Sequence, residues 1–236
     1  MNSILAQIRK ELKVNTDTQT QKSFQRFFKE QVKYYGVKTE TVGKIAKKYW
    51  KQVQTLDKQE IFGLCKELYR SDYTEEAFVV AFWLPNYIDH LEPSDLPFFK
   101  GWIERYINNW AKCDGFCNHT IGDLVQKYPE TLNEIREWAK SGNRWLRRAA
   151  AVSLIVPAKK GCFLQDALEI CDQLLNDGDD MVQKGYGWLL KEESRIHQKE
   201  VYDYIIKNRR VMPRTALRYA IELMPKELKI EAMKKE

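Results

Sequence analysis

The sequence predicts an all-α fold, and three observations support this class. No stretch alternates apolar and polar residues for long enough to form a strand, which would show a period of two. The 236 residues include only 11 glycines and 7 prolines, whereas an all-β fold needs such residues at its many tight turns. Apolar residues, 44% of the chain, instead recur every three or four positions in segments of roughly 10 to 18 residues.

In the first half of the chain, apolar faces at helical spacing define six predicted helices. Residues 15–20 are polar and form a predicted linker. Gly36 is expected to end the second helix, because glycine readily adopts the left-handed conformation found after helix ends. Pro85 lacks an amide hydrogen and is expected to kink or end the fifth helix. The six predicted helices cover residues 3–12, 23–35, 39–50, 57–69, 74–87 and 94–107.

The second half of the chain carries clearer start and stop signals. A break at Asn108-Asn109 precedes a helix that opens at about Trp110. Pro129 suits a helix start. Asn143 can cap the helix that follows it, and Pro157 is expected to stop that helix. The predicted helices cover residues 110–128, 130–140, 145–156, 162–175, 180–193, 198–207, 213–223 and 225–234.

Four short stretches share a pattern in which a polar residue precedes a small one. They begin 34, 36 and 30 residues apart, within the range of two-helix repeats. Small residues let neighbouring helices approach closely, so we expect one continuous domain over residues 1–236, built as a curved solenoid of helix pairs. Residues 74–78 are an earlier, degenerate copy. The four stretches are residues 113–117, 147–151, 183–187 and 213–217.

The positive charge is concentrated in one region. The net charge is +6 and the pI about 8.9, and no Asp or Glu occurs between Trp138 and Gln165. A local positive field of this kind suits a polyanion, although a solvated basic helix face would look the same in sequence. The cations of this region are Lys140, Arg144, Arg147, Arg148, Lys159 and Lys160.

Cysteine usage and hydropathy exclude several classes of protein. The five cysteines are odd in number and no signal-peptide pattern opens the sequence, so we expect a reducing cytoplasm and no disulfide framework. Cys113, Cys117 and His119 supply at most three metal ligands, with no second pair at finger spacing, and we expect no metal. No apolar run approaches the roughly 20 residues that span a bilayer.

Trp110 and Asp114 are four residues apart and share one face of the predicted helix. An indole beside a carboxylate can be ordinary packing, or it can hold something cationic. If the repeat stretches are equivalent, Asp114 lies on one ridge with three cations, and two tryptophans and an arginine flank it. Cations with aromatic platforms suit a nucleic-acid groove. The ridge cations are Lys184, Arg148 and Arg214, and the flanking residues are Trp110, Trp188 and Arg218.

These motifs resemble those of the AlkD-type DNA glycosylases in the DNA alkylation repair family. The matching pieces are Trp110-x3-Asp114 and residues 145–150 and 183–188. Residues 26–29, followed by Tyr35-Gly36-Val37, resemble the family's amino-terminal helix and turn. The similarity extends over about residues 20 to 225. Each motif is weak alone, but three in order at comparable separations are fairly specific.

The resemblance implies a right-handed solenoid of HEAT-like repeats with a basic concave face on duplex DNA. It implies a monofunctional enzyme of the cytoplasm and nucleoid, a monomer without metal or cofactor, which hydrolyses the N-glycosidic bond of N3- and N7-alkylated purines. Asp114 matches the catalytic carboxylate, and Trp110 and Trp188 match aromatic residues around the sugar. Arg148 matches a residue at the DNA backbone, with Arg147 its nearest competitor.

Other assignments for DNA contacts follow more loosely, and one residue departs from the family. Lys184, Arg214 and Arg218 are expected to contact DNA. Phe27 stands where some members have tyrosine, which removes any hydrogen bond made by that hydroxyl. Lys112 could suggest a Schiff-base lyase, but it lies about 200° around the helix from Asp114 and should face elsewhere.

Two alternatives remain open from the sequence. The first is a non-catalytic, structure-specific DNA-binding solenoid, although a pure binder has no chemical reason to keep the carboxylate together with both tryptophans. The second is a HEAT-like protein scaffold, which the basic stretch disfavours. The preferred adduct, the tolerance of bulky adducts and base extrusion are not encoded in any motif of this chain.

Overall fold

The computed structural model describes residues 2–234, and its secondary structure within them is helical. These residues form no strand, and the one β-bridge joins Lys33 and Tyr73. The all-helical prediction is therefore confirmed. The chain divides into two compact units, one that ends at Phe116 and one that begins at Cys117. A single domain over residues 1–236 stays a prediction.

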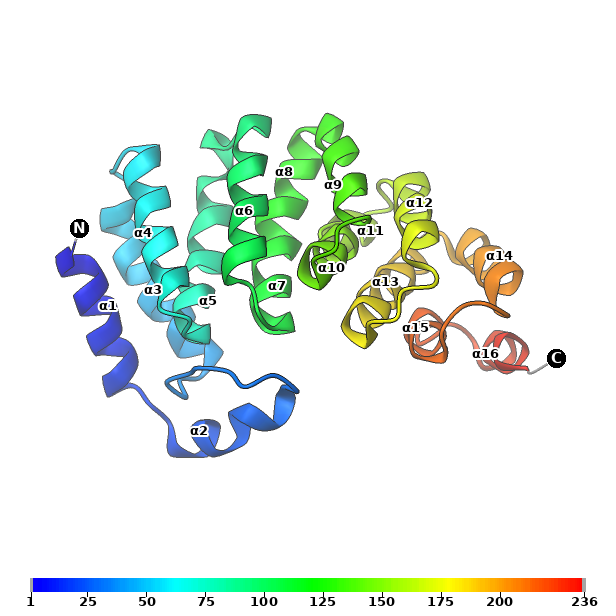
Figure 1. The fold of residues 1–236 in the computed structure, drawn as a ribbon, viewed down its shortest axis with the longest axis horizontal. Coiled ribbons are helices and arrows are strands. Elements are labelled where there is room, and N and C mark those ends of the chain that lie inside the picture. The colour runs from blue at the N-terminus through cyan, green and yellow to red at the C-terminus, as the bar shows by residue number, and fades with distance from the viewer. Residues whose placement is uncertain (1, 235–236) are drawn as a thin grey trace. The chain divides into compact units, whose positions relative to one another are not determined.

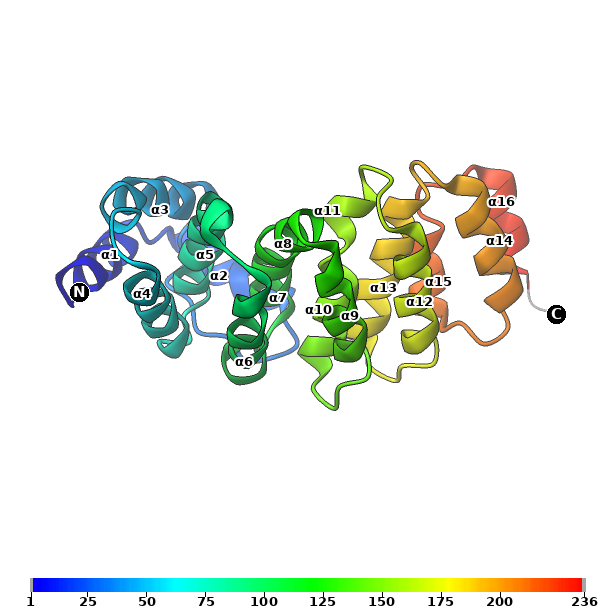
Figure 2. The same cartoon turned by 90° about the horizontal axis from the view of Figure 1, so that it is seen from above.

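The amino-terminal unit packs its helices in two rows (Figures 1 and 2). In one row α3 contacts α1 and α5, and α5 contacts α7. In the other row α4 and α6 contact each other, and α4 also packs against α5. The short helix α2 lies in the connection between α1 and α3. The bounds are α1 Asn2–Val14, α2 Thr18–Phe24, α3 Thr39–Val53, α4 Lys58–Arg70, α5 Thr74–Trp83, α6 Leu96–Tyr106 and α7 Trp110–Phe116.

The carboxy-terminal unit also stacks its helices in sequence. The helix α13 contacts both α10 and α15, and α12 packs across α9, α10 and α13. The four-residue helix α11 contacts α8 and α13. Its bounds are α8 Gly122–Lys127, α9 Leu132–Trp138, α10 Arg144–Val152, α11 Ile155–Ala158, α12 Leu164–Leu174, α13 Asp180–Glu193, α14 Gln198–Asn208, α15 Arg214–Ala220 and α16 Lys226–Met233.

The predicted helix over residues 23–35 is wrong. The helical part begins earlier, at Thr18, and ends with a 3-10 turn over Gln25–Phe27. The linker prediction over residues 15–20 is wrong for the same reason. Residues 28–38 are not helical, and Glu75 on α5 accepts the amide hydrogens of Tyr35, Gly36 and Val37. A tertiary contact here outweighs local helix propensity.

Two further boundaries differ from the sequence prediction. The segment predicted as helix over 110–128 contains a π-helical stretch, Cys117–Ile121, between α7 and α8. Pro157 does not end a helix but lies within α11. By contrast, α13 has the predicted bounds, and Asn143 caps α10 as expected, with its Oδ1 accepting from the Trp145 amide at 2.8 Å.

The repeat stretches lie on helices that pack against one another in each unit. Stretch 74–78 is on α5 beside α7, and stretches 147–151, 183–187 and 213–217 lie on or at the start of α10, α13 and α15. A Cβ at Gly187 would lie 2.7 Å from the Ala216 carbonyl oxygen and 2.8 Å from the Tyr219 Cβ. Glycine therefore lets α13 approach α15 closely. The solenoid itself stays a prediction.

We expect Gly187→Ala to lower the free energy of unfolding by about 1–3 kcal/mol, because the added methyl group overpacks the α13–α15 contact. Gly63→Ala in α4 is the matched control, since nothing lies within 4 Å of its added Cβ. That control should be neutral or stabilising by about 0.5–1 kcal/mol, through helix propensity. Urea unfolding measures both, and equal effects of the two changes would contradict the packing role.

Candidate functional site

The first turn of α7 places the two residues on which the predicted site depends. Asn109 is fully buried, and its side-chain Oδ1 accepts from the Lys112 amide at 3.0 Å, which caps the helix. Trp110 and Asp114 follow one turn apart on this helix. Asp114 is 8% exposed. Its carboxylate is therefore largely removed from water, where its field on a nearby positive charge is stronger.

The indole of Trp110 is held in one orientation by the amino-terminal segment. Its ring stacks on Phe28 at 5.3 Å between centroids, and its Nε1 donates to the Phe27 carbonyl oxygen at 3.1 Å. Phe28 in turn stacks on Phe24 at 5.2 Å, and Phe24 on Tyr34 at 4.6 Å. Stacked rings of this kind restrict rotation. Trp110 remains only half-buried, so part of the indole is accessible.

Phe27, which departs from the family pattern, contacts Trp110 through its backbone. Its side chain is 68% exposed, whereas its backbone carbonyl accepts the indole hydrogen bond of Trp110. The contact to Trp110 is thus made by an atom that every residue type possesses. A hydroxyl on this ring is not needed to orient the indole.

Two buried carboxylates at the start of α5 anchor the segment that contacts Trp110. Glu75 accepts from the amides of Tyr35, Gly36 and Val37 at 3.0, 2.8 and 3.1 Å. Glu76 accepts from the Tyr35 hydroxyl at 2.7 Å and from Arg9 Nε at 3.0 Å. Both side chains are fully buried, and both lie in the first helical turn, where the helix dipole favours negative charge.

Lys112 is fully engaged away from solvent. Its ammonium group donates to the Asp72 carboxylate at 2.7 Å, to the Asp72 carbonyl at 2.9 Å and to Asn108 Oδ1 at 3.0 Å. Burial lowers the pKa of Lys112, although the hydrogen bond and the charge of Asp72 oppose that shift. The group therefore holds the α4–α5 turn to the start of α7, which agrees with rejecting it as a nucleophile.

In the carboxy-terminal unit, Arg148 is packed between helices. It is 5% exposed, and its Nη1 donates to the carbonyl oxygen of Met181 in the first turn of α13. A Cβ at Gly185 would lie 3.3 Å from the Arg148 Cγ. The small residue of this repeat stretch therefore leaves room for the arginine. Arg148 therefore presents little of its surface to a phosphate.

The predicted basic region is partly neutralised by an acidic loop. Arg147 Nε pairs with Asp177 at 2.6 Å, and its Nη1 also donates to the Ser141 carbonyl at 2.9 Å. Arg144 pairs with Asp179 at 2.9 Å. These acids come from the turn before α13, about 30 residues away in sequence. The free positive field is weaker than the sequence count implies, and Arg147 is the poorest candidate for a phosphate contact.

The remaining predicted cations differ in their exposure and in whether they have a hydrogen-bond or ion-pair partner. Lys184 pairs with Asp180 at 3.3 Å, and Arg214 Nη2 donates to the Met233 carbonyl at 3.0 Å. Arg218 is exposed and makes no ion pair within residues 2–234. Arg218 is therefore the most available of these cations. The residues Arg148, Lys184 and Arg214 lie on α10, α13 and α15, which pack in this order.

Trp188 has a partner that sequence inspection missed. Its Nε1 donates to Glu192 Oε1 at 3.0 Å, one turn later on α13. Glu192 is 4% exposed and also pairs with Arg195. Burial opposes the ionisation of Glu192, but the hydrogen bonds from Arg195 and Trp188 outweigh it and lower the pKa. The i, i+4 spacing of Trp188 and Glu192 was visible in the sequence.

Glu193 is the most unusual titratable group of α13. It is fully buried, and neither carboxylate oxygen has a hydrogen-bond partner. Burial raises the pKa of Glu193 to about 7, and the charge of His197 counteracts part of that shift. The carboxyl is therefore substantially protonated near neutral pH. A carboxyl in an apolar environment gave no signal in the sequence.

Neither a metal site nor a membrane span is found in the part of the chain that the structure describes. Within residues 2–234, no group of three or more His, Cys, Asp and Glu side chains is placed to hold a metal ion. None of the helices in this range combines the length and apolar character that crossing a bilayer requires. All five cysteines are free thiols.

Comparisons with known proteins identify one family model and two solved structures of similar fold. Residues 8–224 match the family described as DNA alkylation repair enzyme. A structure titled as a predicted DNA alkylation repair enzyme from Enterococcus faecalis is 17% identical, with a TM-score of 0.80, over 90% of this chain and 98% of that one. The structure of smu.31 from Streptococcus mutans UA159 is 20% identical, with a TM-score of 0.57, over 81% and 96%.

The two solved structures show likeness of fold alone, because both identities are low. No curated protein matches the sequence.

We expect Glu75→Gln to lower the free energy of unfolding by about 1.5–3 kcal/mol, because buried amide hydrogens lose a charged acceptor. Hydrogen exchange at Tyr35, Gly36 and Val37 should accelerate. Glu40→Gln is the matched control, since its carboxylate pairs with Lys44 on the exposed surface and should contribute little to stability. Unchanged exchange in the Glu75 variant would contradict the anchor.

We expect Glu193→Gln to stabilise the protein more at pH 8 than at pH 4.5. The folded carboxyl keeps its proton up to about pH 7, whereas the unfolded carboxyl loses it near 4.5. The contribution of Glu193 to the free energy of unfolding of the wild type should therefore fall as pH rises through this window. The fall is about 1.4 kcal/mol per unit of pKa difference and roughly 3 kcal/mol in all. The Gln variant lacks this component.

Urea unfolding at the two pH values measures the difference between wild type and the Glu193 variant. Glu222→Gln is the control, because Glu222 is exposed and pairs with Lys191 at 3.2 Å. A difference between wild type and Glu193→Gln that stays constant with pH would show that the Glu193 carboxyl has the same pKa in the folded and the unfolded protein.

Proposed function

The chain belongs to the DNA alkylation repair enzyme family, and from this premise we propose that it is a monofunctional DNA glycosylase that hydrolyses the N-glycosidic bond of alkylated purines. The substrate class is duplex DNA with N3- or N7-alkylated purines. One observation supports this function above the others: a mostly buried carboxylate, Asp114, lies one helical turn from an indole that the amino-terminal segment orients. No coenzyme or metal enters the proposed reaction.

The proposed chemistry needs little from the protein apart from charge stabilisation. An N3- or N7-alkylated purine is cationic and leaves without strong protonation by a general acid. Its departure leaves oxocarbenium character on the deoxyribose, which a carboxylate can stabilise while it orients the attacking water. Asp114 has this role, and Trp110 contacts the sugar and adds cation–π attraction. Lys112 is engaged by Asp72, so hydrolysis rather than Schiff-base chemistry follows.

Contacts to DNA are assigned by exposure and pairing of the candidate cations. Arg218 is the strongest, since it is exposed and unpaired within the described residues. Lys184 and Arg214 are half-buried, so part of each side chain remains accessible to phosphates. Arg148 contributes through the small part of its surface that is exposed, and Trp188 is the second aromatic residue at the sugar. A basic concave face on a right-handed solenoid of HEAT-like repeats, acting as a monomer in the cytoplasm and nucleoid, is part of this proposal.

We expect Asp114→Asn to slow release of 7-methylguanine from duplex DNA by about 10²- to 10³-fold, the loss typical of one electrostatic stabiliser in a transition state. Affinity for the same duplex should change little, because one charge is removed rather than a phosphate contact. Asp203→Asn, a surface carboxylate on α14 that pairs with Lys199, is the control and should leave both quantities unchanged.

Single-turnover release and fluorescence anisotropy measure the two properties separately. The same experiment on 3-methyladenine covers the second purine adduct. Binding without release from either substrate would replace this proposal with a non-catalytic, structure-specific DNA-binding protein. Neither binding nor release would favour a protein scaffold.

A further inference from the structure

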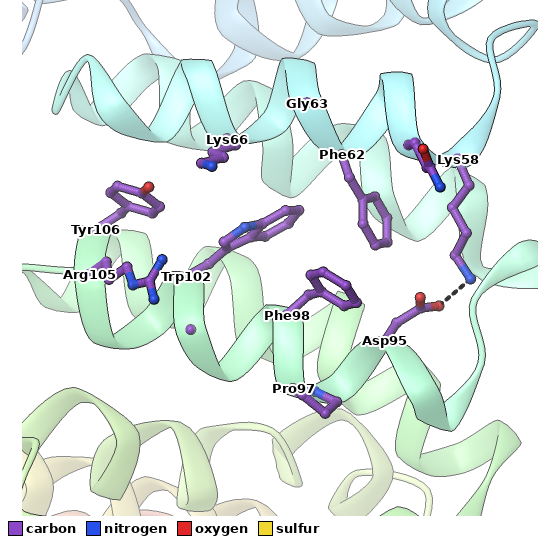
Figure 3. Close-up of a pocket in the computed structure, with 12 residues that line it drawn as sticks. Lys58, Phe62, Gly63, Lys66, Asp95, Pro97, Phe98, Trp102, Arg105 and Tyr106 are labelled. Atoms are coloured by element: carbon purple, nitrogen blue, oxygen red, sulfur yellow. Dashed lines mark ion pairs between the residues drawn. The ribbon is translucent and has the colours of Figure 1, made fainter.

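A groove of the amino-terminal unit lies between α4 and α6 (Figure 3). It has a volume of about 680 Å³, within the range of ligand and peptide sites. Two glycines face it, Gly63 from α4 and Gly101 from α6, and a Cβ added at either would meet nothing within 4 Å. The groove is therefore open along both helices rather than filled by side chains.

Aromatic rings form the floor of this α4–α6 groove, and the core supports them from behind. Phe62 contacts Phe98 at 6.2 Å and Trp102 at 5.3 Å between ring centroids. Trp102 in turn contacts the fully buried Phe99 at 5.5 Å. Rings locked by packing give a surface that exists before anything binds.

Phe98 shows that the floor is also accessible. Its side chain is 60% exposed, although it touches an aromatic cluster that continues into the core. A bulky apolar group at the mouth of a groove, rimmed by polar residues, is typical of an interaction site.

The rim of the groove is positively charged. Lys66 and Arg105 are exposed and make no ion pair within residues 2–234. Asp95 is the one acid among the lining residues, and it is 5% exposed and paired with Lys58 at 2.6 Å, as Figure 3 shows. The groove therefore offers two uncompensated cations beside an apolar floor, which complements a ligand with both carboxylates and bulky apolar groups.

The ring geometry favours a protein segment over a nucleic acid. Bases need ring faces to stack on, but Phe62 meets its neighbours at 61° and 70°, and Trp102 is only 7% exposed. Such edge-to-face packing leaves recesses that suit branched and aromatic side chains. The groove also lies in the α4–α6 row, whereas Asp114 lies on α7 in the other row of this unit, so its use does not depend on the proposed base release.

We propose that the α4–α6 groove is a docking site for a partner protein that presents an acidic amphipathic helix. Bulky apolar side chains of that helix occupy the space above Gly63 and Gly101 and pack on Phe98 and Phe62. Its carboxylates pair with Lys66 and Arg105. This is the helix-in-groove mode, in which anchors spaced three and four residues apart enter one apolar channel.

Two synthetic peptides of about 16 residues test the proposal on the full chain. Both carry the same leucine stripe at helical spacing, one with glutamates and the other with lysines on the polar face. Fluorescence anisotropy should show that the acidic peptide binds at least tenfold more tightly than the basic one. Phe98→Ala should weaken acidic-peptide binding about tenfold. Because Phe98 is exposed, this substitution is not expected to unfold the protein.

A charge reversal makes the test specific to the groove. The double variant K66E and R105E should lose affinity for the acidic peptide and gain affinity for the basic one. The double variant K10E and K47E, which reverses two exposed lysines elsewhere in the same unit, should retain wild-type preference. Circular dichroism verifies the fold of each variant.

Three results would overturn the proposal. One is equal binding of the two peptides. The second is acidic-peptide binding that the Phe98 and Lys66/Arg105 variants leave unchanged. The third is that neither peptide binds, whereas a single-stranded oligothymidylate binds to wild type and not to the groove variants. That result would assign the groove to nucleic acid instead.

Discussion

The carboxylate of Glu75, buried at the start of α5, is the interaction on which the candidate site of the amino-terminal unit depends. It accepts the amide hydrogens of three consecutive residues, from Tyr35 to Val37. These bonds hold the segment after α2 against α5, and Phe28 of that segment stacks on Trp110 of α7. Because the indole takes its orientation from this segment, the geometry beside Asp114 is set by a carboxylate that does not itself belong to the site.

Charge pairing limits what the basic region of the carboxy-terminal unit can do. Arg144 and Arg147 are neutralised by Asp179 and Asp177, and Arg148 lies buried against α13. These arginines therefore stabilise the α10–α13 contact and the loops beside it. Affinity for a polyanion then rests on fewer, more exposed cations such as Arg218, and a shallower salt dependence of binding follows from that smaller number.

The amino-terminal unit separates two kinds of surface onto two rows of helices. The row that contains α7 carries the carboxylate and the oriented indole, whereas the row of α4 and α6 carries an aromatic groove with a cationic rim. The buried cluster of Tyr69, Phe99 and Phe116 lies under the groove floor and also packs the end of α7. One core therefore supports both surfaces.

Local signals in the sequence were sufficient for much of the helical architecture. Asn109 and Asn143 cap their helices as side-chain chemistry predicts, and glycines occur where helices approach closely. The sequence also placed Trp110 one turn from Asp114, since that relation depends only on helical periodicity. The same motifs indicated the DNA alkylation repair family, and the match over residues 8–224 confirms that family, whereas AlkD-type glycosylase activity stays a proposal.

Other features were decided only by tertiary structure, because they depend on residues far apart in the chain. Residues 23–35 have helical periodicity, yet the last of them, Tyr35, is not helical. Its amide donates to Glu75, some 40 residues away in sequence. The acidic turn before α13 neutralises arginines about 30 residues earlier. Burial of Glu193 without a partner likewise arises from packing around α13. Periodicity and capping act within a few residues, whereas charge pairing and desolvation are set by whichever segments the fold brings together.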